Sequence, residues 1–122
     1  MLFADKLYQI KSLEKSDLGD ISATLTLNAQ HPIFEGHFPN QPVLPGVCTI
    51  QAVTDVLEQA LGYKVQSQSA SNIKFTNMVN PTAHPEIQLR IKTNSLENGG
   101  IKIDAEAIRS GENCLKLKGI FS

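Results

Sequence analysis

The sequence predicts an α+β fold in which a curved antiparallel sheet of five to six strands wraps round one central helix, at about residues 46–61. One stretch alone has apolar residues at helical spacing, whereas five or six stretches alternate apolar and polar residues with the period of a strand. A single helix can bury a broad apolar face only against a sheet, so the strands are expected to form one sheet around it.

Length and composition indicate one soluble domain. At 122 residues the chain is large enough for a single core, and we interpret residues 1–122 as one domain. The net charge is −1, and the chain has neither a run of basic residues nor an apolar stretch of about 20 residues, which argues against nucleic-acid and membrane partners. Asp5 and Lys6 interrupt any signal-peptide core, so we expect a cytoplasmic protein in which Cys48 and Cys114 are reduced core thiols.

The strands are expected in a simple order along the chain. Residues 7–13 alternate loosely and suit either a first strand or part of a short helix, whereas residues 20–28 alternate strictly, with threonines on the polar side. Later strands are predicted over residues 65–76, 87–92, 101–107 and 115–121, with a hairpin turn at Asn98-Gly99-Gly100. Because an open sheet has edges that need covering, a dimer that extends the sheet is expected.

Residues 31–61 join an irregular loop to the predicted helix. The loop carries four of the chain's six prolines, which exclude regular structure because each fixes φ and removes a donor. Helical spacing of apolar residues begins at Val47 and runs to Leu61, and Gly62 is placed to end the helix. A loop histidine thus lies before a helix whose first amides lack partners, an arrangement that suits an anion or a polarised carbonyl.

The loop also carries a recognisable motif. Gly36-His37-Phe38-Pro39, followed by Pro42 and Pro45-Gly46-Val47, resembles the signature of the hotdog-fold 3-hydroxyacyl-(acyl-carrier-protein) dehydratases. The resemblance implies a hotdog fold and removal of water from a 3-hydroxyacyl thioester to give the trans-2-enoyl thioester, in fatty acid or related acyl-chain biosynthesis. No cofactor is expected. His31 and His37 lie in one loop, but no third ligand has a convincing spacing, so no metal is expected either. The implied partner is an acyl carrier protein that holds the acyl chain on phosphopantetheine.

The family's chemistry carries over to this chain with one departure. It implies that His37 takes the proton from C2 and that the Gly46 amide holds the thioester carbonyl, where the developing enolate needs a donor. The family's acid stands fourteen residues after the histidine, where this chain has Gln51. The family commonly has a glutamine four residues later still, where this chain has Asp55. Our hypothesis is that acid and amide have exchanged places on one helix face.

Three functions therefore stay open. A working dehydratase would use His37 with Asp55, which would donate its proton through a water or to a shifted substrate. The alternatives are a catalytically impaired acyl-binding subunit that partners an active dehydratase, and an acyl thioesterase. The displacement of roughly 6 Å between neighbouring helical side chains is serious, because an error of about 1 Å can cost roughly 100-fold in rate. Asp55 could equally belong to the polar face of an amphipathic helix.

The candidate site comprises catalytic and substrate-binding residues. The catalytic candidates are His37, Asp55 and Gln51, and the substrate-binding candidates are Gly46, Val47, Phe38 and Phe34. Phe34 and Phe38 are expected either to line the acyl tunnel or to pack under the loop. A homodimer is expected, or a heterodimer with a related hotdog protein, and higher oligomers stay open.

Several other polar residues receive structural interpretations. His31 is expected to bond the backbone, His84 to be exposed to solvent, and Cys48 to be a core residue rather than a nucleophile. Because carrier proteins are acidic, their docking surface is expected to be locally basic. The candidate basic residues alternate with apolar strand positions: Lys74, Arg90, Lys92, Lys102, Arg109, Lys116 and Lys118. For most of them we favour the simpler interpretation that they form the solvent-facing side of the sheet.

Overall fold

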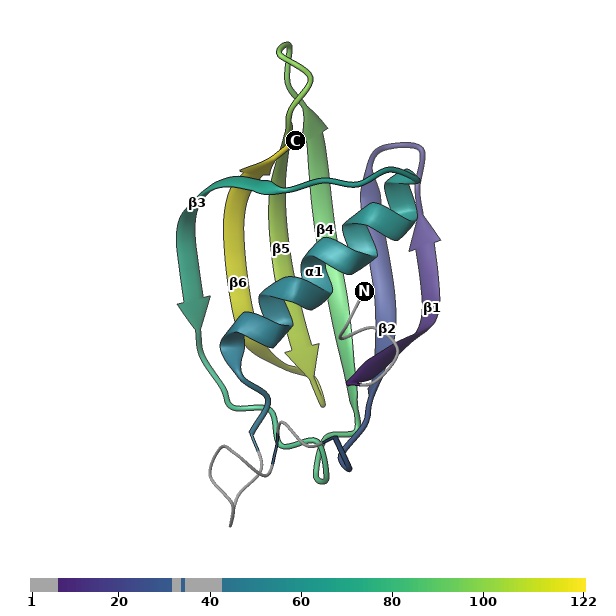
Figure 1. Ribbon diagram of the computed structural model, residues 1–122, viewed down its shortest axis with the longest axis vertical. Helices are drawn as coiled ribbons and strands as arrows, with labels where there is room; N and C mark the ends of the chain where they lie inside the picture. The colour runs from purple at the N-terminus through teal and green to yellow at the C-terminus, as the bar shows by residue number, and fades with distance from the viewer. Residues whose placement is uncertain (1–6, 32–33, 35–42) are drawn as a thin grey trace.

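The computed structural model describes residues 7–31, 34 and 43–122, and within them six antiparallel strands form one sheet around one helix (Figure 1). The strands lie in the order β1-β2-β4-β5-β6-β3. Their bounds are β1 Tyr8–Lys15, β2 Asp20–Leu27, β3 Ser67–Phe75, β4 Glu86–Ser95, β5 Ile101–Arg109 and β6 Glu112–Phe121, and helix α1 is Gly46–Leu61. The predicted architecture is therefore confirmed.

Helix α1 has the predicted bounds and lies across the concave face of the sheet (Figure 1). It ends at Gly62, which has the left-handed φ of 83° and donates its amide to the carbonyl of Glu58 at 2.8 Å. The side that faces the sheet buries Cys48, Ala52, Val53, Val56 and Leu57. The part of the chain that the structure describes contains no helix long and apolar enough to cross a membrane.

Residues 7–13, for which the sequence left two alternatives, contribute to strand β1. The register between β1 and β2 shifts between Ile10 and Ser12. A bulge of this kind inserts one residue, so Tyr8, Ile10 and Leu13 can all pack on the core despite their uneven spacing. Tyr8, at the beginning of the strand and before the bulge, pairs with the buried Leu27 and contacts Asp55 of the helix.

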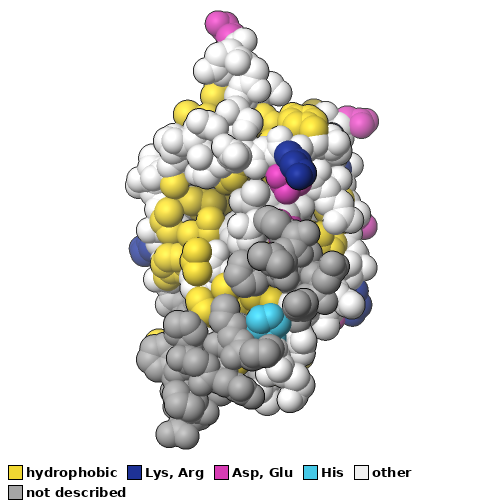
Figure 2. Space-filling view, in the orientation of Figure 1, with side chains coloured by type: hydrophobic (Ala, Val, Ile, Leu, Met, Phe, Trp, Pro, Cys, Tyr) yellow, Lys and Arg dark blue, Asp and Glu magenta, His cyan; other side chains and the backbone are white. Residues whose placement is uncertain are grey.

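Strand β3 forms one edge of the sheet and pairs with β6 alone. All nine of its residues are exposed, among them the apolar Ile73 and Phe75. Figure 2 shows hydrophobic side chains at the surface between this edge and the helix. An exposed apolar edge strand is a template for pairing with another chain.

Candidate functional site

Asp55 is the buried acidic side chain of the described chain, with 7% of its surface exposed. The phenol of Tyr8, at the beginning of β1, donates a hydrogen bond to its Oδ2 atom. The Nε2 atom of Gln51, one helical turn earlier, donates to its Oδ1 atom at 3.0 Å. Both carboxyl oxygens thus accept a hydrogen bond, which offsets the cost of burying the group.

The interpretation of Asp55 as part of a solvent-facing helix surface is wrong. Gln59, on the same helix, is exposed, whereas Gln51 and Glu58, one turn before Asp55 and one turn after it, are half-buried. Glu58 accepts the backbone amide of Val65 at 3.0 Å through Oε2, so it ties the helix to the chain that follows. Asp55 points inward because strand β1 supplies a donor for it, which the helix sequence by itself does not reveal.

Tyr8 is a permanent donor in this cluster. Its side chain is 2% exposed. Burial, and secondly its hydrogen bond and charge interaction with Asp55, raise the pKa of the Tyr8 phenol far above its ordinary value of about 10. The phenol therefore keeps its proton at any pH at which the protein works.

A pocket of about 420 Å³ opens beside the beginning of α1, between the helix and the segment that follows β3. It is lined by Val43, Leu44, Gly46, Thr49, Phe75, Thr76, Asn77, Met78, Val79 and Cys114. Gly46 lies close under the ring of Phe75: a Cβ atom at this position would lie 2.6 Å from the ring and would displace it. The first helical turn has no acidic residue, and no side chain in the described residues caps it. Within the described residues the amides of Gly46 and Val47 have no acceptor, so they can bind a carbonyl oxygen.

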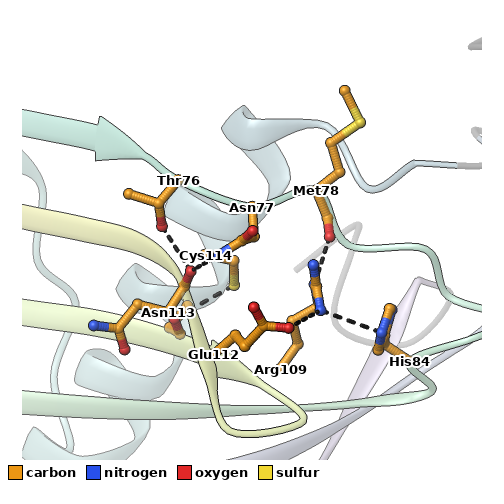
Figure 3. Close-up of polar contacts among 9 residues, drawn as sticks. Thr76, Asn77, Met78, His84, Arg109, Glu112, Asn113 and Cys114 are labelled. Atoms are coloured by element: carbon orange, nitrogen blue, oxygen red, sulfur yellow. Dashed lines mark hydrogen bonds and ion pairs between the residues drawn. The ribbon is translucent and has the colours of Figure 1, made fainter.

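Hydrogen bonds to the end of β5 and the beginning of β6 hold the wall of this pocket (Figure 3). The carbonyl of Asn113 accepts the Thr76 hydroxyl at 2.6 Å and the Asn77 side-chain amide at 2.7 Å. The thiol of Cys114 donates to the carbonyl of Ala107 at 3.4 Å. The wall is therefore anchored to the sheet.

Arg109 braces the same wall from the end of β5 (Figure 3). Its Nε atom donates to the carbonyl of Met78 at 2.6 Å, and its Nη1 atom lies 3.2 Å from Glu112 Oε1 and 3.3 Å from His84 Nε2. The prediction that His84 is solvent-exposed is wrong: the side chain is half-buried against this guanidinium. Its exposure was inferred from neighbouring prolines and small residues, which carry no information on a contact 25 residues away.

The substrate-binding candidates are distributed unevenly. Gly46 lines the pocket, whereas Val47 is 71% exposed and lies outside the pocket lining. Phe34 is 4% exposed and packs in the core. His37 and Phe38 lie outside the residues that the structure describes, so their roles stay predictions.

The pocket and the Asp55 carboxyl group are separate regions of one chain. Neither Gln51 nor Asp55 lines the pocket. Gly46 and Asp55 are nine positions apart on the helix, which corresponds to roughly 13 Å along its axis. At this separation, the Gly46 amide and the Asp55 carboxyl group can act on neighbouring atoms of one substrate only if they come from two different chains.

Neither cysteine has the surroundings of a nucleophile. Cys48 and Cys114 are 1% and 2% exposed, and burial raises the pKa of both thiols. The prediction that Cys48 is a core residue is confirmed.

Tyr8 is the site residue that sequence reasoning missed. The available signal was weak: a tyrosine on the apolar side of a strand needs a hydrogen-bond partner when buried. Because residues 7–13 suited a strand or a helix equally, neither its face nor its partner 47 positions away could be predicted.

Comparison with known proteins gives a consistent result. Residues 12–111 match the model of the ApeI-like family, described as ApeI dehydratase. A 3-hydroxyacyl-(acyl-carrier-protein) dehydratase FabZ from Xanthomonas euvesicatoria is 31% identical over 105 residues, covering 75% of this chain and 69% of that protein.

Solved structures agree in fold. A chain of the dehydratase heterocomplex ApeI:P from Xenorhabdus doucetiae superposes with a TM-score of 0.69 at 22% identity, covering 92% of this chain and 96% of that one. A hypothetical thioesterase with coenzyme A from Streptococcus pneumoniae gives a TM-score of 0.64 at 11% identity, covering 93% and 83%. The predicted hotdog fold is confirmed, and the fold alone does not separate the two chemistries.

Proposed function

The chain belongs to the ApeI-like family of dehydratases, and we propose that it removes water from a 3-hydroxyacyl thioester to form the trans-2-enoyl thioester. The observation that carries this proposal is the Asp55 carboxyl group, buried one helical turn after the expected acid position. It is held there by donors on both oxygens, from Tyr8 and from Gln51. A surface carboxylate would not need such support.

The proposed reaction uses three groups. His37 accepts the proton from C2, and negative charge develops on the thioester oxygen, which the Gly46 amide binds. The electron pair then forms the C2–C3 double bond, the C3–O bond breaks, and the hydroxyl group leaves as water with a proton from Asp55. Each carboxyl oxygen has two lone pairs, so the bonds from other residues leave a place for this proton. Exchange with solvent restores both residues.

The proposed site is completed by a second chain. The separation of the pocket from Asp55 supports this, as does the exposed edge strand β3, along which two hotdog chains can join their sheets. The second chain is a further copy or a related hotdog protein. The heterocomplex described for the similar ApeI protein supports the second possibility.

The proposed partner that delivers substrate is an acyl carrier protein. A shallow depression on the face of the sheet away from the helix gathers five basic and two acidic residues: Lys74, Arg90, Lys92, Lys116, Lys118, Asp104 and Glu106. Four of the basic residues lie opposite Asp104 or Glu106 of β5, whereas Lys74 on β3 lies directly opposite Lys116. Like charges in such a pair are unfavourable. An acidic partner would relieve that repulsion, and Lys74 adjoins Phe75 of the pocket.

A charge reversal tests the docking surface. Lys74→Glu with Lys116→Glu is expected to raise KM for the carrier-linked substrate without changing turnover of a short soluble thioester. Lys102→Glu, on the same strand face but outside the depression, is the control. An equal effect of both variants on the carrier-linked substrate would contradict the assignment.

One assay separates the three candidate functions. The protein is incubated with a 3-hydroxyacyl carrier protein, and the product is identified by mass. Loss of water is the expected result. Release of the free carboxylic acid without dehydration would establish thioesterase activity. This is the second candidate, because a hypothetical thioesterase has a similar fold. Binding of the acyl carrier protein without either product would establish a catalytically impaired subunit. This is the third candidate, because Gln51 stands at the acid position.

A further inference from the structure

The phenol of Tyr8 has no role in the reaction as the family's motif implies it, yet it contacts the proposed acid. We propose that Tyr8 is a positioning residue that fixes the Asp55 carboxyl group and, through it, the Gln51 amide. This inference rests on the proposed function. It explains how a chain with an amide at the usual acid position can still present an ordered acid one turn later.

Tyr8 is itself held rigidly. Its side chain is 2% exposed and belongs to the main core cluster. Its strand is held on both sides of it: Gln9 pairs with Thr26 of β2, and the Asn28 amide donates to the carbonyl of Leu7 at 2.7 Å. The phenol oxygen therefore reaches Asp55 from a fixed point on the sheet.

Asp55 needs a donor at a fixed position on the sheet. The terminal torsion of an aspartate is broad, so the helix backbone alone does not fix the plane of the carboxyl group. A donor from the sheet on Oδ2 and a donor from the helix on Oδ1 fix that plane. Loss of the Tyr8 hydroxyl would leave the group held from the helix side alone.

Asp55 in turn orients the Gln51 amide. The Nε2 atom of Gln51 donates to Oδ1 of Asp55, so the Oε1 atom of Gln51 is directed elsewhere. Gln51 is half-buried and occupies the position at which the family carries its acid. Its carbonyl oxygen and second N–H are therefore available to the 3-hydroxyl group of the substrate. The hydrogen bonds from Tyr8 to Asp55 and from Gln51 to Asp55 together set the orientation of the Gln51 amide.

Tyr8 is not itself the acid. Its hydroxyl hydrogen is directed at Asp55, and the side chain is enclosed in the core. A role that is only structural would alter stability and leave the chemical step of the folded protein unchanged, and this difference gives the test.

The experiment compares Tyr8→Phe with Thr54→Val in steady-state dehydration of a 3-hydroxyacyl carrier protein. Thr54 precedes Asp55 on the same helix, and its hydroxyl bonds the carbonyl of Ile50 at 3.3 Å. Tyr8→Phe is expected to lower kcat on the order of 10- to 100-fold with KM changed by less than about twofold. Thr54→Val is expected to leave both constants unchanged. Unchanged kcat in Tyr8→Phe, or an equal loss in both variants, would overturn the proposal.

A second measurement needs neither activity nor a folded variant. In the wild-type protein the side-chain amide of Gln51 is expected to exchange with water more slowly than that of Gln59, the exposed glutamine of the same helix. Equal exchange rates, measured by NMR, would overturn the positioning of Gln51. If the wild type dehydrates nothing while Gln51 is protected, the proposed function fails and the hydrogen-bond order stands. If the wild type is active and the Gln51 amide is unprotected, the proposed function stands and the proposed positioning of Gln51 fails.

Discussion

The bond between Tyr8 and Asp55 should be measurable as a coupling free energy in a double-mutant cycle. Tyr8→Phe removes one donor from a buried carboxylate, and Asp55→Leu leaves the buried phenol without an acceptor. A hydrogen bond to a charged group contributes about 1.5–3 kcal/mol, and an unsatisfied buried group costs about 1–3 kcal/mol. We therefore expect each variant to lower the free energy of unfolding by about 2 kcal/mol, and the double variant to cost less than the sum by about 1.5–3 kcal/mol.

The assay is urea unfolding at neutral pH, at one fixed protein concentration because association would contribute to stability. The half-buried Gln51 loses its acceptor in both variants that contain Asp55→Leu, so this cost cancels in the cycle. In a control cycle, Thr93→Val takes the place of Asp55→Leu beside Tyr8→Phe. The Thr93 hydroxyl donates to the carbonyl of Gly19 at 2.8 Å, away from the site. A Tyr8–Asp55 coupling below about 0.5 kcal/mol, the level of distant pairs, would refute the reasoning.

Three further predictions concern the same site. Gln51→Glu combined with Asp55→Gln restores the family's arrangement, with the acid first and glutamine four residues later. The dehydration rate should rise only if the exchange of acid and amide impairs this protein. An unchanged or lower rate would favour a site adapted to Asp55. Gly46→Ala should weaken acyl-thioester binding in a titration calorimetry experiment, because the methyl group would lie 2.6 Å from an aromatic ring, and unchanged affinity would contradict this. The raised pKa of Tyr8 means that the native state keeps a proton which the unfolded chain releases above about pH 10, so stability should fall as pH rises past that value. The fall should be smaller in Tyr8→Phe, measured against Tyr63→Phe as control, and an identical fall in both would contradict it.

Much of the fold could be predicted because its signals are local. The helix was predicted at about residues 46–61 and is Gly46–Leu61, since its apolar spacing and the following Gly62 both lie in one short stretch. Strand β3 was expected over residues 65–76 and is Ser67–Phe75. Alternation of apolar and polar residues normally indicates one buried face, but all nine residues of β3 are exposed. An edge strand lacks a buried face in the single chain, so its pattern is weak.

The site was less predictable because its contacts are long-range. The position of Asp55 relative to Gln51 follows from helical periodicity, but its burial depends on Tyr8, 47 positions earlier in a segment with an ambiguous pattern. The pairing of His84 with Arg109 is of the same kind. Gly46 was predicted as a binding residue, and its place in the pocket depends on the ring of Phe75, which only the sheet brings near.

The most direct test of the proposed function is the dehydration rate of Asp55→Asn beside that of His37→Ala. Asparagine keeps an acceptor for Tyr8 but has no proton to give, so the fold is retained and the acid is lost. The rate is measured in a single turnover with a 3-hydroxyacyl carrier protein. We predict a loss on the order of 100-fold or more in both variants, the range assigned to general acid–base catalysis. Loss in His37→Ala with an unchanged rate in Asp55→Asn would contradict the assignment of Asp55 as the acid.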